Sequence, residues 1–257
     1  MFMGVTWAAN NMPRSDKTSD GGDDAWFILN SIGAAGVADG VGSWRKKGVN
    51  AGKYARQLMN RVSAAMDTVG LSANPYKALS SAYQKPSKLG GSTTALIVKP
   101  DGQKLYVCQL GDSGMIIIRN GRCVYASDEQ EHFFDTPYQL GNNNDSPSDS
   151  FRYVIPIQDS DTIILGSDGL FNNVYIPHIV NMVNNFPLSD GRVNLESIAT
   201  ALVDEAFAKS QSSDYWSPYA QRGYVAGIHN AFDLKVVGGK PDDITCLVGR
   251  VSGVGLL

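Results

Sequence analysis

The chain has 257 residues and carries 22 Lys and Arg against 25 Asp and Glu residues, which gives a formal net charge of −3. Hydrophobic residues make up 43% of it and the mean hydropathy is −0.16, values that exclude a largely disordered protein. No basic face is available for a nucleic acid, and no apolar run reaches the roughly 18–20 residues of a membrane-spanning helix. We therefore expect no nucleic-acid partner and no membrane insertion.

Ten short apolar runs bounded by turn residues predict β-strands along the chain. The dipeptide Asn120-Gly121 separates two of these runs and favours a type I′ hairpin turn, because both of its residues tolerate positive φ. The predicted strands cover residues 2–9, 25–30, 34–38, 93–99, 104–110, 115–119, 122–126, 151–156, 162–166 and 244–250.

A 3.6-residue apolar repeat predicts a helix from Ala51 to Val69, with Asn50 as its N-cap and Gly70 just beyond its end. Strands dominate both ends of the chain and do not alternate strictly with helices, as they would in a doubly wound parallel sheet. We expect an α+β fold of antiparallel sheets covered by helices, in a single domain over residues 1–257. Further helices are predicted near 75–84, 176–185, 195–209 and 217–224.

Cysteine spacing and the N-terminal residues bear on the compartment. Cys108, Cys123 and Cys246 lie singly in runs typical of buried strands, which indicates free core residues rather than redox or metal ligands. Unpaired cysteines suit a reducing compartment. The first residues lack the basic and apolar regions of a secretion signal. The chain as given is expected in the cytosol, or in a mitochondrion or plastid if a presequence has been removed.

Acidic residues lie where several predicted strands begin or end. Asp39-Gly40 and Asp168-Gly169 follow apolar runs, Asp23-Asp24 and Asp242-Asp243 precede them, and Asp112 lies between two strands. If these carboxylates converge, they repel one another unless they are protonated or bound to cations, and all-oxygen ligands favour Mg²⁺ or Mn²⁺ over zinc. The residues alone leave convergence open, since an isolated Asp-Gly pair usually marks a turn.

Taken in order, six motifs spread over nearly the whole chain resemble those of the metal-dependent Ser/Thr phosphatases of the protein phosphatase 2C (PPM) family. Two further segments, SDEQEHFFDTPYQL at 127–140 and SPYAQ at 217–221, resemble the branch found in mitochondria and plastids. The six motifs are GGDDAWF at 21–27, ADGVGSW at 38–44, GSTTALIV at 91–98, LGDSG at 110–114, GSDGLFNN at 166–173 and GGKPDDIT at 238–245.

The resemblance implies a four-layer α-β-β-α sandwich of two antiparallel sheets, with two Mn²⁺ or Mg²⁺ ions in a cleft between them. It implies that Asp39 bridges the two ions and that the carbonyl of Gly40 binds one of them. Asp168 and Asp242 are implied as ligands of the other ion. In this family direct hydrolysis of phosphoserine or phosphothreonine uses a hydroxide that bridges the ions, without a phosphoenzyme, so Asp39 and Asp168 are the expected catalytic carboxylates.

The remaining acidic residues have implied roles around the same ions. Asp23 and Asp24 are expected to complete the shell of the second ion, directly or through water. Asp112 together with Asp168 is expected to hold a weaker third ion, as in some family members.

Three departures from the family pattern are visible. Val41 stands where many members have a histidine that is the proposed general acid, so metal-bound water or another residue, such as His132, would take that role. The interpretation of His132 as a histidine held within a structural loop is favoured over that role. Asn172 stands where a carboxylate often follows the Asp-Gly segment. The family's phosphate-binding arginine has no certain counterpart; Arg14 and Lys17 are the candidates, against an interpretation as solvated loop charges.

The departures keep three functions open. The first is a Mn²⁺- or Mg²⁺-dependent phosphatase that acts on a phosphorylated protein. The second is a pseudophosphatase that binds phosphoproteins without turnover, and the third is a small-molecule phosphatase on the same fold. A monomer is expected from the resemblance.

Overall fold

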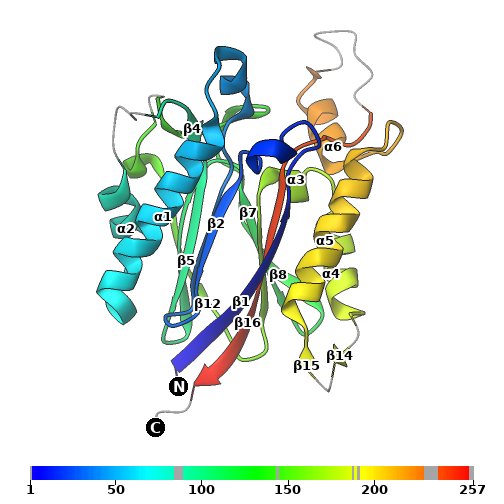
Figure 1. Cartoon of the computed structure of the whole chain (residues 1–257). Helices are drawn as coiled ribbons and strands as arrows, with labels where there is room; N and C mark the ends of the chain where they lie inside the picture. The colour runs from blue at the N-terminus through cyan, green and yellow to red at the C-terminus, as the bar shows by residue number, and fades with distance from the viewer. Residues whose placement is uncertain are drawn as a thin grey trace.

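A computed structural model describes residues 2–83, 89–142, 145–186, 188–189, 192–228 and 237–254. Two five-stranded antiparallel sheets lie face to face in it (Figure 1). The first sheet has the order β1 (Phe2–Met12), β16 (Ile244–Val254), β13 (Thr162–Gly166), β7 (Gly114–Arg119) and β8 (Arg122–Ala126). The second has the order β12 (Phe151–Pro156), β6 (Lys104–Leu110), β5 (Ala95–Asp101), β3 (Ala34–Ala38) and β2 (Ala25–Leu29).

Helices cover the outer face of each sheet, which completes the expected four layers. Buried side chains of α1 (Ala51–Val69) and α2 (Pro75–Ala82) pack on the second sheet, and those of α4 (Ile176–Asn184) and α5 (Leu195–Ser210) pack on the first. The predicted α+β sandwich is confirmed. Two shorter helices are α3 (Asp168–Phe171) and α6 (Pro218–Val225).

Local signals set several boundaries as expected. Helix α1 begins at its predicted N-cap, where the side chain of Asn50 accepts a hydrogen bond from the backbone N–H of Lys53, and it ends before Gly70. Asn120 and Gly121 have φ values of 49° and 75°, as a type I′ turn requires. Cys123 is exposed, contrary to expectation, because it lies on β8 at the edge of its sheet.

The sequence patterns did not predict the short strands, because two or three residues are too few to show a periodicity. They connect the larger elements above the sheets and beside the helices. These strands are β4 (Ser92–Thr93), β9 (Glu131–Phe133), β10 (Thr136–Pro137), β11 (Leu140–Gly141), β14 (Leu188–Ser189) and β15 (Arg192–Val193).

The core between the sheets is apolar and closely packed. Trp7 of β1 is buried there, donates a hydrogen bond from Nε1 to the carbonyl of Gly33 at 2.7 Å, and leaves no room for a side chain at Gly249, whose Cβ would lie 2.6 Å from its ring. No helix among the described residues is long and apolar enough to cross a membrane.

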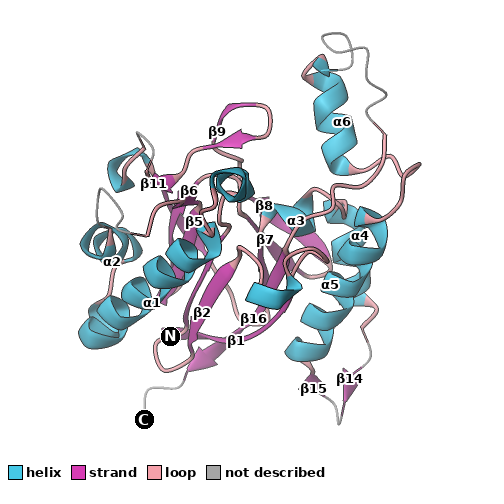
Figure 2. Cartoon of the chain, turned by 45° about the horizontal axis from the view of Figure 1, so that its top comes forward, coloured by secondary structure: helices cyan, strands magenta, loops and turns pink. Residues whose placement is uncertain are grey.

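Strand register explains why the acidic segments meet. Ala25 pairs with Ala38, so the residues before β2 and after β3 lie at one end of the second sheet. Gly166 pairs with both Gly114 and Cys246, so the residues after β13 and before β7 and β16 lie at one end of the first sheet. These two ends are adjacent at the top of Figure 1 and come forward in Figure 2.

Candidate metal centre

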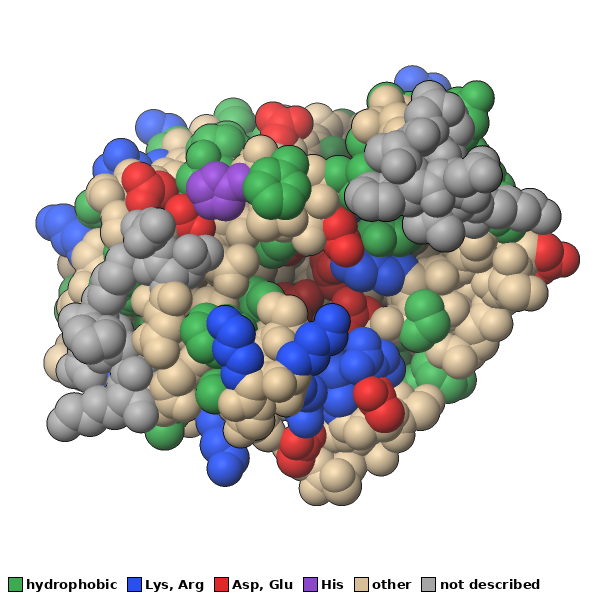
Figure 3. Space-filling model, turned by 90° about the horizontal axis from the view of Figure 1, so that it is seen from above, with side chains coloured by type: hydrophobic (Ala, Val, Ile, Leu, Met, Phe, Trp, Pro, Cys, Tyr) green, Lys and Arg blue, Asp and Glu red, His purple; other side chains and the backbone are tan. Residues whose placement is uncertain are grey.

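Acidic residues from both sheets line one cleft of about 380 Å³ at this end of the molecule. Six of the predicted site residues line it: the carboxylates Asp39, Asp112, Asp168 and Asp242, and the cations Arg14 and Lys17. Figure 3 shows acidic side chains within a hollow and Lys and Arg side chains along its edge. The structure therefore brings together the carboxylates whose convergence the sequence left open.

Asp39 and Gly40 are held tightly at the end of β3. The backbone N–H of Asp39 donates to Thr94 Oγ1 at 2.9 Å, and its carbonyl accepts from the N–H of Thr94 at 2.9 Å. Gly40 donates its N–H to the carbonyl of Asp23 at 3.1 Å. A Cβ at Gly40 would lie 2.6 Å from that carbonyl oxygen, so the close approach of these segments requires glycine.

Asp24 and Asp168 are buried carboxylates held from one side. Oδ2 of Asp24 accepts hydrogen bonds from Ser167 Oγ at 2.7 Å and Thr245 Oγ1 at 2.6 Å. Oδ2 of Asp168 accepts from Lys240 Nζ at 2.6 Å. Each side chain is thus oriented through one oxygen, which leaves the other available to a ligand.

Three buried carboxylate oxygens, Oδ1 of Asp24, Asp112 and Asp168, have no hydrogen-bond partner among the described residues. Burial and neighbouring carboxylates raise the pKa of Asp24 and Asp39 well above the usual range, that of Asp112 to about 8 and that of Asp242 to about 6. An unpaired buried carboxylate is costly, and hard divalent cations take oxygen ligands of this kind. The donor set therefore fits Mg²⁺ or Mn²⁺.

Asp168 differs in its ionisation from its neighbours. Burial raises its pKa, but the charge and hydrogen bond of Lys240 outweigh burial, so the pKa of Asp168 is lowered. Lys240 Nζ also lies 2.7 Å from Asp135 Oδ1 and 3.8 Å from Asp242 Oδ2. Asn173 fixes the backbone of Lys240 by accepting its N–H at 2.8 Å and donating to its carbonyl at 2.9 Å.

Asp23 lies behind the cleft in an ion-pair network. Its carboxylate is buried, accepts from Arg45 Nη2 at 2.7 Å, and pairs with Lys17 Nζ at 2.9 Å. Lys17 Nζ also donates to Asp243 Oδ2 at 2.6 Å and lies 3.6 Å from Asp242 Oδ1. Burial lowers the pKa of Lys17, but the hydrogen bonds to Asp243 and Asp23 more than offset it, so that pKa is raised.

Arg14 lies at the edge of the cleft, where its side chain forms a bidentate pair with the exposed Asp16 at 2.6 and 2.9 Å. The exposed Lys46 also lines the cleft. The sequence analysis assigned no role to Lys46, Lys240 or Asp243. A signal for the last two was present, since both belong to the motif GGKPDDIT.

The departures from the family pattern are also located. Val41 lines the cleft. His132 does not; its Nε2 lies 3.0 Å from Asp145 Oδ1 and its ring stacks on Tyr138, as a structural loop residue would. Asn172 is buried and donates from Nδ2 to Asp168 Oδ2 at 3.0 Å, so an amide supports the carboxylate there.

Within the described part of the chain, no three His, Cys, Asp or Glu side chains already surround a common point as a metal cage. Lys17 and Lys240 instead lie among the carboxylates and balance part of their charge. A cation site is therefore indicated by the donor set and its three buried oxygens without a partner among the described residues, and not by a finished coordination shell.

Comparisons with known proteins show which family this chain resembles. A family model described as protein phosphatase 2C matches residues 3–203. The chain is 37% identical over 246 residues to "Probable protein phosphatase 2C 55" of Arabidopsis thaliana, covering 94% of this chain and 50% of that protein. It is 36% identical over 251 residues to "Protein phosphatase PTC7 homolog fig" of Drosophila virilis, covering 90% and 78%. The chain thus spans about half the length of the first relative.

Solved structures show the same architecture. The photosystem II phosphatase PBCP superposes with a TM-score of 0.89 at 29% identity, over 98% of this chain and all of that chain. The catalytic domain of the Ser/Thr phosphatase PstP, solved with two manganese ions, has a TM-score of 0.66 at 17% identity, over 98% and 100%. The second likeness speaks for the fold alone.

Proposed function

The chain belongs to the protein phosphatase 2C family, and from that premise we propose that it is a metal-dependent phosphatase of phosphoserine and phosphothreonine in proteins. The observation that carries the proposal is a set of three buried carboxylate oxygens without a partner among the described residues: those of Asp112 and Asp168, which line the cleft, and that of Asp24, whose charge acts on Asp39. Such a set suits divalent cations, which phosphoryl transfer requires to neutralise phosphate charge.

Mn²⁺ or Mg²⁺ is the proposed cofactor. Asp39, Asp168 and Asp242 would hold two ions with the carbonyl of Gly40, and Asp24 would complete the shell of one of them. When bound, the ions neutralise the phosphate and lower the pKa of a water that can attack phosphorus. A third ion between Asp112 and Asp168 remains part of the proposal. We assign Asp23 to the support of this shell, because Arg45 and Lys17 already engage both of its oxygens.

Arg14 is the better of the two candidates for the substrate phosphate. Its guanidinium is partly exposed at the cleft edge, and its present partner Asp16 is an exposed side chain that a phosphate can replace. Lys17 is 2% exposed and engaged by Asp23 and Asp243, which favours a role in holding those carboxylates. Lys240 orients Asp168 and offsets its charge.

The leaving Ser or Thr oxygen must receive a proton. Val41 has no ionisable group, so the proton must come from another donor. His132 is directed at Asp145 and lies outside the cleft lining. Water in the cleft is therefore the donor that we propose. This assignment predicts that His132→Ala leaves kcat unchanged within about two-fold, since no step uses its imidazole.

The substrate is proposed to be a phosphorylated protein in an organelle, because the relatives include a PTC7 homologue and the photosystem II phosphatase PBCP. A monomer is the proposed state, and light scattering on the purified chain tests it against the mass of 27.6 kDa. No observation favours a pseudophosphatase or a small-molecule phosphatase over this proposal.

The test is phosphate release from phosphothreonine and phosphoserine peptides with Mn²⁺, with Mg²⁺ and with EDTA, for the native chain and Asp168→Asn. We expect release that depends on metal and is lost in the variant. If the protein is folded but releases no phosphate with any metal, the result contradicts the proposal and favours the pseudophosphatase. Release from metabolite phosphates with little from peptides would favour the small-molecule enzyme.

A further inference from the structure

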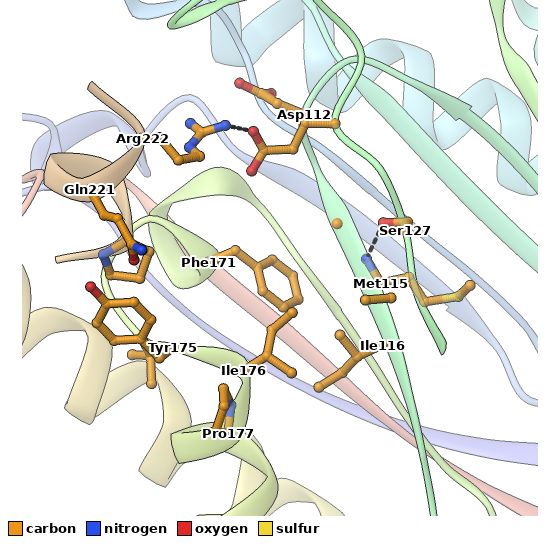
Figure 4. Close-up of a pocket in the computed structure, with 15 residues that line it drawn as sticks. Asp112, Met115, Ile116, Ser127, Phe171, Tyr175, Ile176, Pro177, Gln221 and Arg222 are labelled. Atoms are coloured by element: carbon orange, nitrogen blue, oxygen red, sulfur yellow. Dashed lines mark hydrogen bonds and ion pairs between the residues drawn. The ribbon is translucent and has the colours of Figure 1, made fainter. Parts of the chain in front are cut away.

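A second cavity, of about 310 Å³, opens beside the metal cleft, and Asp112 lines both (Figure 4). It lies between β7 and β8 of the first sheet, the segment from α3 to the start of α4, and helix α6. The reaction proposed above uses none of its other lining residues. We call it the apolar pocket.

Aliphatic and aromatic side chains form much of the lining of the apolar pocket. Ile116 of β7 lies on one side, and Phe171 and Ile176 face it from the other (Figure 4). Val174 also lines the pocket. The Phe171 ring packs directly against Gly114, where a Cβ would lie 2.9 Å from the ring. When an apolar group displaces water from walls of this kind, the burial of apolar surface favours binding.

Three charged residues also line the apolar pocket: the buried Asp112, and Arg222 of α6, which pairs with Glu129. Arg222 Nη2 also donates to Asn172 Oδ1 at 3.1 Å, and Asn172 Nδ2 donates to Asp168. Arg222 is therefore joined to the metal centre through the side chain of Asn172. A group seated in the pocket and a phosphate in the cleft would lie in adjoining spaces.

We propose that the apolar pocket binds one apolar side chain of the phosphoprotein substrate, close in sequence to the phosphorylated residue; this inference rests on the proposed function. An apolar cavity of about 150 Å³ accommodates a benzene ring, so this volume suits a Leu, Met or Phe side chain. An extended peptide advances about 3.3 Å per residue, so a residue within a few positions of the phosphate reaches the adjoining pocket. Continuity with the cleft at Asp112 favours the substrate over any other occupant.

The experiment uses phosphothreonine peptides in which each of the three positions on either side of the phosphate is in turn Ala, Leu, Phe or Glu. At one position we expect Leu or Phe to raise kcat/KM roughly 10- to 100-fold over Ala, mainly through KM, since burial of one such side chain gives discrimination of that order. Hydrolysis of all peptides within two-fold of one another overturns the proposal.

Two variants locate the preference. Ala126→Trp fills the pocket from an exposed position, and Ile176→Glu places a charge in its wall. Each is expected to abolish the Leu-over-Ala ratio while turnover of the Ala peptide persists. Val124→Glu, on the exposed face of the same strand β8 and outside the pocket lining, is the matched control and keeps the ratio.

Three outcomes separate this inference from the proposed function. Metal-dependent hydrolysis of the Ala peptide with no apolar preference, or with a preference that both variants retain, contradicts the pocket alone. No hydrolysis of any peptide contradicts the phosphatase, and peptide binding measured by fluorescence anisotropy then reports whether the apolar preference exists. A change in oligomeric state in both variants, without a change in peptide preference, means that a second copy occupies the pocket and overturns the inference.

Discussion

The carboxylates of the acidic centre fall into two groups with different partners. In the first group, the engaged side, Asp23 and Asp243 have a hydrogen-bond donor at every oxygen, from Lys17, Arg45 and backbone N–H groups. In the second group, the free side, Asp24, Asp112 and Asp168 each keep one buried oxygen without a partner among the described residues. The carboxylates are of one chemical kind, and only their partners differ.

The difference separates two tasks that the sequence alone cannot distinguish. A carboxylate with all its oxygens engaged joins chain segments, and Asp243 joins the loop before β2 to the start of β16 by accepting the N–H groups of Arg14 and Asp23. A carboxylate with a free oxygen still has a ligand to offer. We therefore expect variants on the engaged side to change stability first and variants on the free side to change metal-dependent activity first.

The largest expected effect is on stability, for Lys17→Met. Removing one partner of a buried ion pair leaves an uncompensated charge, and we expect the free energy of unfolding to fall by about 3–5 kcal/mol, measured by urea denaturation without metal. Lys53→Met, at an exposed position on α1, should stay within about 0.5 kcal/mol of the native value. A Lys17→Met protein as stable as the control would mean that the engaged side does not hold the fold together.

The next effect is on activity, for Asp39→Asn. Losing a carboxylate that holds the ions should lower kcat roughly 10²- to 10³-fold, the usual scale for removing one electrostatic contact to a transition state. The circular dichroism spectrum should be unchanged and the unfolding midpoint should not fall, because the charge of Asp39, which lies among other carboxylates, opposes folding. The exposed Asp101→Asn is the matched control. If Asp39→Asn loses its fold together with its activity, the effect on activity cannot be separated from an effect on stability, and the expected contrast between the two groups of carboxylates is contradicted.

Metal removal sharpens the same comparison. A ligand at 100 times its Kd stabilises the folded state by about 2.7 kcal/mol, so Mn²⁺ should raise the unfolding midpoint of the native chain and EDTA should reverse the rise. The shift should vanish in Asp39→Asn and persist in Lys17→Met. Equal shifts in both variants would show that Mn²⁺ binds without Asp39, outside the proposed site in the cleft.

Local patterns predicted the fold well and the partners of the acids poorly. Helix α1 and strands β6, β8, β12 and β13 have the predicted boundaries, because apolar periodicity and turn residues act within a few positions. The engagement of Lys240 with Asp168 spans 72 positions of sequence, and Asp135, its other partner, lies in a turn between strands too short to predict. Which acid is engaged and which is free depends on such distant contacts.

The smallest effect is expected for Asn172, the buried amide beside Asp168. Its side chain carries no charge; Nδ2 donates to Asp168 Oδ2 at 3.0 Å and Oδ1 accepts from Arg222 Nη2 at 3.1 Å. Partners that orient a metal ligand typically contribute 10- to 100-fold to metal affinity or activity, so Asn172→Ala should raise the Mn²⁺ concentration needed for half-maximal activity by about that factor.

Asn185→Ala, at an exposed position beyond α4, is the matched control for Asn172→Ala and should leave the Mn²⁺ requirement unchanged. A lower kcat at saturating Mn²⁺ with an unchanged metal requirement would instead place Asn172 among the groups that act on the substrate. Asp168 would then be held well enough by Lys240 alone, and the free oxygen of a carboxylate would need only one engaged neighbour to stay in position.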